Sequence, residues 1–375
     1  MGEISFKVNT KNKENLTLPV LSNSAEYGIV NQEDYFDKKI ANRTDNYYIV
    51  KHNDFVYNPR ISKKAPYGPI RRNTLDTKGL MSPLYYVFRI NDGNYIYLDY
   101  YFKSSKWYKF MYQNGDSGAR SDRFAIKDKI FQMMPINMPN TKEQNKIGQL
   151  IQTLQKLIDL QQRKLEQLKQ LKKAMLQQLF VNKNNKQPNL RFKNFNGDWK
   201  QHKLKDISAF ENGRAYKQNE LLKEGKYPVL RVGNFYTKDQ WYYSNLELDK
   251  NKYANNGDLL YTWSATFGPH IWSGPQVIYH YHIWKIQISN KINKFFLYSF
   301  LEADKVNLLH NTNGSTMIHI TKSNMENKVI MYPKTEEQLK IGQISSHINN
   351  SITLQQNKLT QLTIFKKYLL QKMFI

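Results

Sequence analysis

The sequence predicts an α+β fold of two globular domains, each with a mixed or antiparallel sheet and each followed by a long helix. Three observations support this prediction: the chain repeats itself, short aromatic strands fill each half, and each half ends in heptad-spaced apolar residues. We expect the helices to pack as an antiparallel coiled coil, because a parallel pair would place both duplicated domains at the same end. A general structural coiled coil is the alternative.

The composition excludes several protein classes. The chain has 375 residues, with 56 Lys plus Arg against 31 Asp plus Glu, and a formal net charge of +25. It contains no cysteine, which excludes a disulfide framework and a thiolate metal site. No apolar run approaches the roughly 18 residues of a membrane span, and the N-terminus lacks the apolar core of a signal peptide. We therefore expect a soluble, cytoplasmic protein with a polyanionic partner, nucleic acid being the leading candidate.

An internal repeat organises the chain. Residues 139–181 align without gaps on residues 333–375, and 21 of the 43 aligned positions are identical. Weaker matches follow in the same order through the preceding halves, as when Asp54–Tyr57 aligns with Asp258–Tyr261. The predicted parts are a first domain at 1–138, a central spacer helix at 139–181, a linker at 182–188, a second domain at 189–332 and a C-terminal spacer helix at 333–375.

Runs with period two, rich in aromatic residues and bounded by Gly, Pro, Asn and Asp, predict strands in both halves. The clearest are 47–50, 54–57, 85–90, 258–261 and 283–286, with short helices near 100–109 and 295–305.

A basic loop joins two matched strands of the first half. Residues 58–72 hold five cations punctuated by Pro and Gly, which suits phosphate positioning and bidentate guanine recognition by Arg. Its counterpart, 262–272, is less charged and more aromatic, so the two halves should read different sequences. Two ordinary surface loops are the alternative. The candidate DNA-binding residues here are Arg60, Ser62, Lys63, Lys64, Tyr67, Arg71, Arg72, Ser264, Thr266 and His270.

A second candidate surface precedes each long helix. Residues 117–123 and 313–316 combine Gly with small hydroxyl residues, which permits close backbone approach to a phosphate. A structural turn explains the pattern equally well. The candidate DNA-binding residues here are Arg120, Arg123, Ser315 and Thr316.

Each long helix has a start signal followed by an apolar seam. Thr141 and Thr335 are predicted N-caps, with Gln144 and Gln338 completing capping boxes. Apolar residues then recur at intervals of three and four positions over four or more heptads, which is the pattern of a coiled-coil seam. The predicted seam and partner-docking residues are Ile147, Ile151, Leu154, Ile158, Gln161, Leu165 and Leu168, and Ile341, Ile348, Ile352, Gln355, Leu359 and Leu362.

Polar and additional apolar residues modify the seam. Gln161 and Gln355 are equivalent, and they lie either at a wet edge or as a pair that fixes the register. Lys172 and Lys366 are likewise equivalent. Further leucines, at 150, 157, 160 and 171, widen the first stripe and indicate that this helix also packs on something besides its twin. A helix of this length spans roughly 57 Å, enough to separate two DNA half-sites about 34 Å apart.

Motifs of catalysis are absent. The sequence has no Walker A motif, no dinucleotide fingerprint and no HExxH. His280 and His282 alternate along a predicted strand, which is more typical of packing than of metal ligation. We nominate no catalytic residue and no metal ligand, and the balance favours a binding module.

The whole pattern resembles the DNA-specificity subunit (S subunit) of type I restriction–modification enzymes. The resemblance rests on Pro-x-Thr-x-Glu-Gln-x-Lys-Ile-Gly, which occurs at 139–148 and 333–342 ahead of each helix. It also rests on Asn189–Trp199 with Lys203–Ile207, which is similar to the opening of a target-recognition domain. Met1 aligns with Leu204, so the first half lacks a counterpart of 189–203 and its N-terminus is expected to be truncated.

The resemblance implies two target-recognition domains, each reading one half of a split DNA site, with the helices as a ruler. It also implies docking of two methyltransferase (modification) subunits and of motor-nuclease (restriction) subunits. S-adenosylmethionine, ATP and Mg would serve those partners, whereas this chain would bind no cofactor and catalyse no step. The alternatives are a basic coiled-coil scaffold or architectural DNA-binding protein without sequence specificity, and a stand-alone nuclease or methyltransferase.

Overall fold

The computed structural model describes residues 1–38, 43–116, 122–181, 185–236, 240–264, 266–311 and 320–374. The chain divides into two compact units, Met1–Gln162 with Asn357–Ile375 (unit 1) and Arg163–Gln356 (unit 2). Each of the two long helices therefore contributes one end to each unit. Among the described residues no helix is both long enough and apolar enough to cross a membrane.

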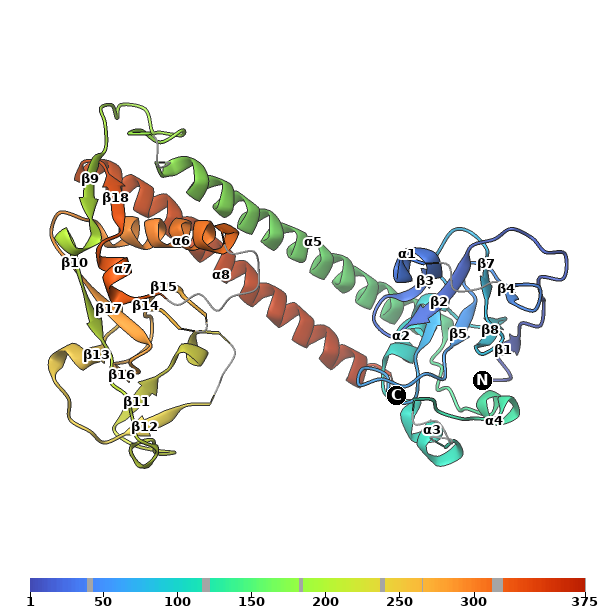
Figure 1. The fold of residues 1–375 in the computed structure, drawn as a ribbon. Helices are drawn as coiled ribbons and strands as arrows, with labels where there is room; N and C mark the ends of the chain where they lie inside the picture. The colour runs from blue at the N-terminus through green and yellow to red at the C-terminus, as the bar shows by residue number, and fades with distance from the viewer. Residues whose placement is uncertain are drawn as a thin grey trace. The chain divides into compact units, whose positions relative to one another are not determined.

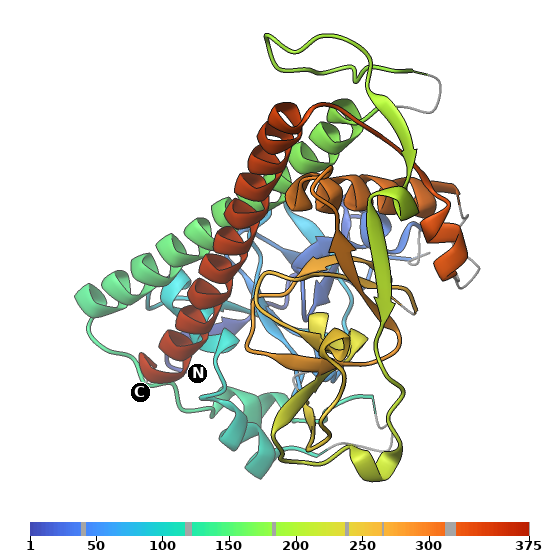
Figure 2. The ribbon, with the colours of Figure 1, turned by 90° about the vertical axis from the view of Figure 1, so that its left-hand side faces the viewer.

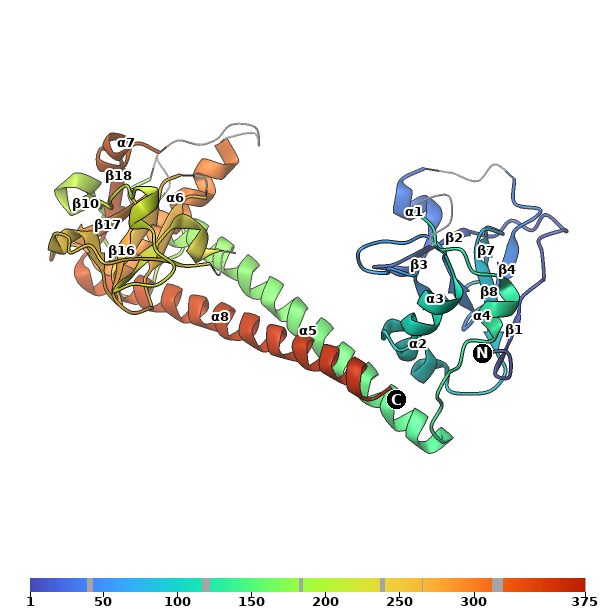
Figure 3. The same cartoon turned by 90° about the horizontal axis from the view of Figure 1, so that it is seen from below.

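Unit 1 contains two four-stranded sheets, in the orders β1-β8-β5-β6 and β3-β2-β7-β4. Helix α2 packs against β6, and Figure 3 shows it at the foot of the strands. The strands are β1 Ser5–Lys7, β2 Val20–Ser24, β3 Gly28–Asn31, β4 Tyr48–Val50, β5 Phe55–Tyr57, β6 Ile70–Arg72, β7 Gly79–Met81 and β8 Tyr86–Ile90. The helices are α1 Gln32–Phe36, α2 Tyr95–Lys103, α3 Tyr108–Asn114, α4 Asp128–Gln132 and the start of α5 Thr141–Leu179.

Unit 2 repeats the arrangement, with sheets β10-β17-β14-β15 and β12-β11-β16-β13 and an additional pair β18-β9. Helix α6 packs against β15, across one end of the strands (Figures 1 and 2). The strands are β9 Lys200–Lys203, β10 Ser208–Asn212, β11 Tyr227–Leu230, β12 Tyr242–Ser244, β13 Tyr253–Ala254, β14 Leu259–Thr262, β15 Gly268–Ile271, β16 Val277–Tyr279, β17 Ile283–Ile288 and β18 Val329–Tyr332. The helices are α6 Lys294–Asn311, α7 Lys322–Glu326 and α8 Thr335–Lys372, with short 3₁₀ turns at Leu204–Asp206, Gln218–Glu220, Val232–Phe235 and Lys250–Lys252.

The strands of the two four-stranded sheets correspond one to one between the units, and β9 and β18 are additional to unit 2. Each first sheet is antiparallel throughout, and each second sheet contains one parallel pair, β2 with β7 and β11 with β16. The strand predictions coincide with β4, β5, β8, β14 and β17. The α+β prediction, with two sheet-containing domains and two long packing helices, is therefore confirmed.

Backbone contacts support the alignment of Met1 with Leu204. The N-terminal amine of Met1 donates to the carbonyl of Met134 at 2.6 Å, and the amide of Leu204 donates to the carbonyl of Lys328 at 3.0 Å. The carbonyl of Met1 accepts a hydrogen bond from Ser5 in the same way that Leu204 accepts one from Ser208. In unit 2, β9 precedes this point and pairs with β18, whereas residues 135–138, the counterpart of β18, form no strand.

The N-cap prediction is wrong. Thr141 and Thr335 are the first helical residues rather than caps. In α5 the cap is Asn140, whose side-chain oxygen accepts from the backbone N–H of Glu143 at 3.0 Å. Asn is a stronger N-cap than Thr, and it stands one position earlier. The glutamines assigned to the capping boxes have another role, described below.

Candidate nucleic-acid interface

One edge of unit 1 brings together segments that are distant in sequence. A hollow of about 890 Å³ is lined by Pro59 from the β5–β6 loop, by residues 83–86 around the β7–β8 turn, and by residues 123–128. The charged residues of its wall are Lys7, Arg123 and Lys127 with Asp116 and Asp128, and Lys7 pairs with Asp128. We call residues 58–69, 82–85 and 122–128 the loop edge of unit 1.

Backbone contacts hold the basic loop against this hollow. The amide of Phe124 donates to the carbonyl of Pro59 at 2.8 Å, and the amide of Ile61 donates to the carbonyl of Asp122 at 2.9 Å. Gly68 has a φ of +79°, and a Cβ there would lie 2.0 Å from the carbonyl oxygen of Asn58. Glycine is therefore required where the loop folds back onto its own start.

Three of the five predicted loop cations face solvent. Arg60, Lys63 and Lys64 are exposed. Arg60 lies 3.9 Å from Asp122 and Lys64 lies 2.9 Å from Glu26, and both pairs are exposed. Exposed ion pairs contribute roughly 0–1 kcal/mol, so a phosphate can replace the carboxylate at little cost.

Ser62 and Tyr67 have structural contacts within the loop. The Oγ of Ser62 accepts from the amide of Ala65 at 3.2 Å and closes a tight turn. The ring of Tyr67 packs edge-on against Tyr108 and Phe124, each 5.1 Å away. Tyr67 therefore supports the loop, whereas Ser62 stays exposed.

The remaining two cations of the predicted set turn inward. Arg71 donates to the backbone carbonyl of Ala25 at 2.7 Å, and burial lowers its pKa. Arg72 donates to the side chain of Asn53 at 2.8 Å and lies 3.8 Å from Asp99 on α2. Because both arginines are held inside unit 1, we do not retain them as base contacts in the proposal below.

The equivalent loop edge of unit 2, residues 262–264, 266–267 and 280–282, is aromatic. Trp263 donates from its indole N–H to the carbonyl of Tyr281 at 2.9 Å, and its ring lies 5.0 Å from that of His282. Tyr281 also contacts His280, at a ring distance of 4.5 Å. Burial, followed by the charges of His282 and Arg231, lowers the pKa of His280 to about 4, so this imidazole is neutral at pH 7.

The predicted contacts of unit 2 are distributed unevenly. Thr266 is exposed and Ser264 is half-buried, both beside Trp263. His270 lies on β15 instead, stacked 3.9 Å from the ring of Phe235 and 3.2 Å from the hydroxyl of Tyr236. Burial, reinforced by the charge of Lys305, lowers the pKa of His270 to about 3. A neutral, packed imidazole is poorly suited to hold a phosphate.

Sequence reasoning missed the aromatic cluster around Trp263. The loop at 262–272 is visibly aromatic, but the turn at 280–282 is joined to it only by the sheet. Arg120, Ser315 and Thr316, by contrast, lie outside the described residues, as do Gly118 and Gly314. Within the described ranges, no group of three or more His, Asp or Glu side chains is arranged to hold a metal ion.

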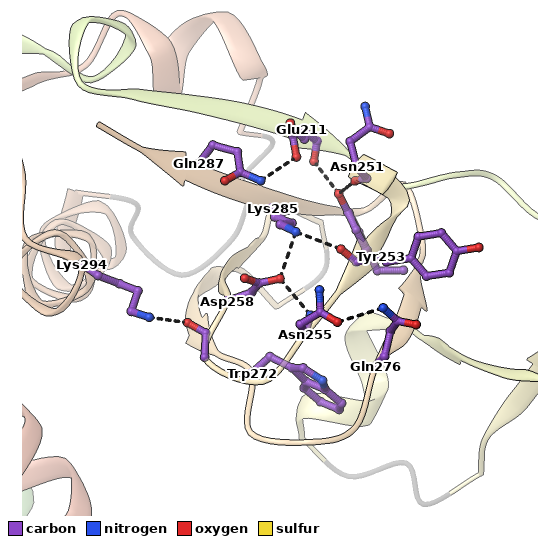
Figure 4. A network of polar contacts seen from close by, with 12 residues as sticks. Glu211, Asn251, Tyr253, Asn255, Asp258, Trp272, Gln276, Lys285, Gln287 and Lys294 are labelled. Atoms are coloured by element: carbon purple, nitrogen blue, oxygen red, sulfur yellow. Dashed lines mark hydrogen bonds and ion pairs between the residues drawn. The ribbon is translucent and has the colours of Figure 1, made fainter. Parts of the chain in front are cut away.

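An ion pair fixes the strand that leads into each loop. In unit 1, Arg89 donates twice to Asp54, at 2.6 and 2.9 Å. In unit 2, the buried Lys285 lies 3.0 Å from Asp258 and donates to the carbonyl of Tyr253 at 3.0 Å, as Figure 4 shows. Asp54 and Asp258 each immediately precede the matched strands β5 and β14.

The repeated Gln of each helix start joins the helix to its domain. The side-chain oxygen of Gln144 accepts from the amide of Asn94 at 2.9 Å, and its nitrogen donates to the carbonyl of Pro139 at 2.7 Å. Gln338 makes the same contacts with Asn293 and Pro333, at 2.7 and 2.9 Å. Both glutamines are buried.

The repeated Gly permits close approach at the same joint. A Cβ on Gly148 would lie 3.3 Å from the backbone nitrogen of Tyr97 in α2. A Cβ on Gly342 would lie 2.9 Å from Asn293 and 3.1 Å from the backbone nitrogen of Phe296 at the start of α6. The repeated Gln and Gly thus have one structural purpose, which is to join each long helix to a domain.

Each domain also receives the far end of the other long helix. In unit 1, Phe374 is fully buried, with its ring 5.2 Å from Tyr97 and 5.8 Å from Tyr101. In unit 2, the equivalent Phe180 lies 5.3 Å from Phe296 and 6.1 Å from Phe300. Within each unit, then, one helix start and one helix end complete the core.

The predicted seam faces inward. None of its residues is exposed, and Gln161 and Gln355 are buried at 8% and 7% exposure, which excludes the wet edge. The repeated lysines of the two helices have different partners. In unit 1 the side chain of Lys366 donates to that of Gln155, and in unit 2 the equivalent Lys172 lies 2.6 Å from Glu302. The described helix surfaces also carry exposed apolar side chains: Leu150, Leu157, Leu160, Leu171, Leu339, Leu354, Ile364, Phe365 and Tyr368.

The sequence matches a family model and curated proteins. The family model for the type I restriction modification DNA specificity domain matches residues 196–363. The specificity subunit of the type I restriction enzyme MjaVIII of Methanocaldococcus jannaschii is 28% identical over 181 residues. That match covers 47% of this chain and 42% of the relative, so less than half of either protein is compared.

Solved structures resemble the fold over the whole chain, and two of them are compared with it as follows. One chain comes from work on complex assembly and conformational transition of the type I R-M system, with a TM-score of 0.59, 15% identity, and coverage of 100% of this chain and 96% of that chain. The other is the S subunit of a type I restriction-modification system from M. genitalium, with a TM-score of 0.60, 14% identity, and coverage of 100% and 94%. At these identities the likeness concerns the fold alone.

Proposed function

We propose that this chain, which the comparisons support as an S subunit of a type I restriction–modification system, recognises a bipartite DNA site and directs adenine methylation and restriction by its partner subunits. In this proposal the chain itself is non-catalytic and binds no cofactor. The partners supply the chemistry and use S-adenosylmethionine, ATP and Mg.

One observation carries the proposal: two units with the same strand order present different chemistry at the same edge. The loop edge of unit 1 offers exposed cations, and that of unit 2 offers aromatic and hydroxyl side chains. An identical scaffold with different loops is the arrangement expected of two readers of two different half-sites. A scaffold that is basic only for solubility gives no reason for the difference.

In unit 1, we assign the DNA contacts to the solvent-facing cations of the loop edge. Arg60, Lys63 and Lys64 have no buried partner to lose, and Arg123 lines the adjacent hollow. Lysines at these positions would hold phosphates, and the arginines can also bind guanine with two hydrogen bonds.

In unit 2, Trp263, Tyr281 and Thr266 provide apolar and hydroxyl contacts to base edges. Substitutions in the cations of unit 1 and in the aromatic and hydroxyl residues of unit 2 should therefore have different effects on DNA binding. Arg60→Ala should weaken binding and reduce its salt dependence, whereas Thr266→Ala should change base preference with little effect on the salt slope.

The long helices offer duplicated surfaces for two copies of one partner. Leu160 in unit 1 and Leu354 in unit 2 are equivalent in the repeat and are exposed at 58% and 72%. Leu171 in unit 2 and Phe365 in unit 1 are also equivalent, and both are 50% exposed. Each unit therefore exposes one member of each pair. Since apolar side chains at equivalent places suit identical partners, we assign these surfaces to two methyltransferase subunits, with the motor-nuclease subunits joining the assembled complex.

Methylome sequencing of cells that express the chain with its methyltransferase partner tests the proposal directly. The expected result is one split adenine-methylated motif. Exchange of residues 60–68, which leaves Arg71 and Arg72 in place, should change one half of that motif. Contiguous methylation, or equal loss at both halves, would contradict independent readers.

Two further changes test the helices. Insertion of four residues, about one helical turn, into either long helix should alter the spacing between the half-motifs if the helices act as a ruler. Leu160→Asp with Leu354→Asp should abolish methylation while leaving the salt-dependent DNA affinity of the isolated chain intact. Binding of DNA without sequence preference would favour the architectural alternative, and methyl transfer or cleavage by the purified chain alone would favour the enzyme alternative.

A further inference from the structure

A pocket inside unit 1 gathers more cations than carboxylates. It has a volume of about 350 Å³ and lies between α2, β6 and the β2–β3 turn, with Gln155 of α5 and Lys366 of α8 on its wall. The charged side chains that form its lining are Arg71, Arg72, Lys103, Lys366, Asp99 and Glu26. The second of the two carboxylates, Glu26, is at the exposed rim and pairs with Lys64 outside the pocket, at 2.9 Å.

Within the pocket lining one carboxylate therefore faces four cations, and Asp159, which accepts a hydrogen bond from Gln155 at 2.7 Å, also acts on Lys366. Asp99 lies 2.9 Å from Lys103 and 3.8 Å from Arg72, and it is only 10% exposed. Among the described residues, Arg71 and Lys366 show hydrogen bonds to neutral groups but no ion pair within 4 Å. Burial lowers the pKa of Arg71, and burial together with the charge of Lys103 lowers the pKa of Lys366.

The groups around the pocket neutralise its excess of positive charge only in part. The ring of Tyr100 lies 4.9 Å from the ammonium of Lys103 and 6.0 Å from that of Lys366, so both cations depend on the same aromatic ring. The Nε of Arg72 is buried and makes no hydrogen bond. A buried donor without an acceptor is costly, and an oxyanion in the pocket would supply one.

The residues of unit 2 that correspond to the pocket lining carry no such surplus of positive charge. Strand register aligns Arg71 and Arg72 with His270 and Ile271, because Phe55 pairs with Arg72 as Leu259 pairs with Ile271. His270 is neutral at pH 7, since its pKa is lowered to about 3.

The helix side of that place is also closer to balance. The counterpart of Lys366 is Lys172, which lies 2.6 Å from Glu302, and Glu302 also faces Lys305. The same joint is thus built with two cations for one carboxylate in unit 2 and with four in unit 1. The surplus is not a requirement of the fold.

We propose that this pocket binds a phosphate group, held by Arg71, Arg72, Lys103 and Lys366. Guanidinium and ammonium groups that converge on one cavity suit a tetrahedral oxyanion, and the volume accommodates the group with hydrating water. Two sources share this chemistry: free phosphate, and a backbone phosphate of DNA that runs past the joint. The proposal does not depend on which bases the loop edges read.

Titration of the full chain with inorganic phosphate, followed by calorimetry and by ³¹P NMR, tests the pocket without DNA. The expected result is saturable binding of one phosphate. Lys366→Met keeps the aliphatic stem and removes one charge-assisted hydrogen bond, so phosphate should bind roughly ten-fold more weakly. Lys367→Met is the matched control, because this exposed neighbour on the same helix does not line the pocket.

A second variant changes the affinity in the opposite direction. Asp99→Asn removes the carboxylate that competes with phosphate, so binding should tighten, which a merely unfolded variant could not mimic. Absence of saturable binding to the wild-type chain, or equal binding by Lys366→Met and Lys367→Met, would overturn the proposal.

Addition of duplex DNA to the phosphate-loaded chain identifies the source. Release of the phosphate assigns the pocket to a DNA backbone phosphate, and Lys366→Met should then lower the salt slope of DNA binding by about 1. Retention of the phosphate beside bound DNA assigns the pocket to the free anion. Failure of the chain to bind DNA would contradict the proposed function but not this pocket.

Discussion

Phe374 offers a decisive test of how the domains are completed. It follows the end of α8, and its ring is fully buried against Tyr97 and Tyr101 in the core of unit 1. Truncation of a buried Phe to Ala costs about 3–5 kcal/mol. Because Phe374 lies two residues beyond the end of α8, where the backbone can partly refill the space, we expect about 3 kcal/mol for Phe374→Ala.

The loss should be confined to unit 1. That unit has about 180 residues, for which 1 kcal/mol shifts Tm by roughly 2–4 °C, so its transition should fall by about 6–12 °C. Hydrogen exchange measured by mass spectrometry should show lost protection in α2 and β5 but not in α6 and β14. Calorimetry should resolve the lowered transition from that of unit 2.

Matched variants make the result interpretable. Phe365→Ala removes the same type of side chain from α8, nine residues before Phe374, but Phe365 is 50% exposed, so stability should change by less than about 0.5 kcal/mol. Phe180→Ala should produce the mirror result, with lost protection in α6 and retained protection in α2. Equal destabilisation of both units by Phe374→Ala, or an effect of Phe365→Ala of similar size, would refute the reasoning.

Three other predictions concern named contacts. Burial lowers the pKa of His270 to about 3, whereas an imidazole in the unfolded chain has a pKa near 6.5, so the unfolded state binds more protons between these two pH values. The free energy of unfolding should therefore be intact above pH 6.5 and fall by up to about 1.4 kcal/mol per pH unit toward pH 3. Denaturant titration should show a smaller pH dependence in His270→Gln. Asp258→Asn leaves the buried Lys285 without its carboxylate and should lower the free energy of unfolding in urea by about 3 kcal/mol. The double variant Asp258→Asn with Lys285→Met should recover part of this loss. No recovery would show that the two residues are not coupled. Gly342→Ala places a Cβ 2.9 Å from Asn293 and should lower the free energy of unfolding by about 1–3 kcal/mol. Gly148→Ala, whose nearest contacts are at 3.3 Å, should lower it by less. The reverse order in thermal melts would contradict the close approach of helix and domain at Gly342.

Some features of the fold and the interface were predictable because they are local in the sequence. The strands at 54–57 and 258–261 and the buried seam follow from periodicity, which depends on neighbours within two turns. The repeat itself needs only self-comparison. Leu160 and Leu171 fall outside the narrow seam and are exposed, and their packing on a further partner stays a prediction.

Other features were not predictable because they depend on contacts between distant segments. Arg60 and Arg72 belong to the same basic loop, yet one faces solvent and the other lies beside Asp99 on α2. Trp263 acquires its partners from a turn nearly twenty residues later. Gln144 matches a capping box, but its side chain bonds to Asn94, fifty residues earlier.

The sequence by itself therefore determined the duplication, the α+β class and the apolar face of each long helix, since these rest on repetition and periodicity along the chain. Only the tertiary structure decided which cations are free and which are buried, and that Phe374 and Phe180 complete the cores of the two units. The physical reason is that burial and charge pairing are properties of residues brought together by folding. A basic residue becomes a candidate DNA contact or a structural ion pair according to what the sheet and the helix ends place beside it.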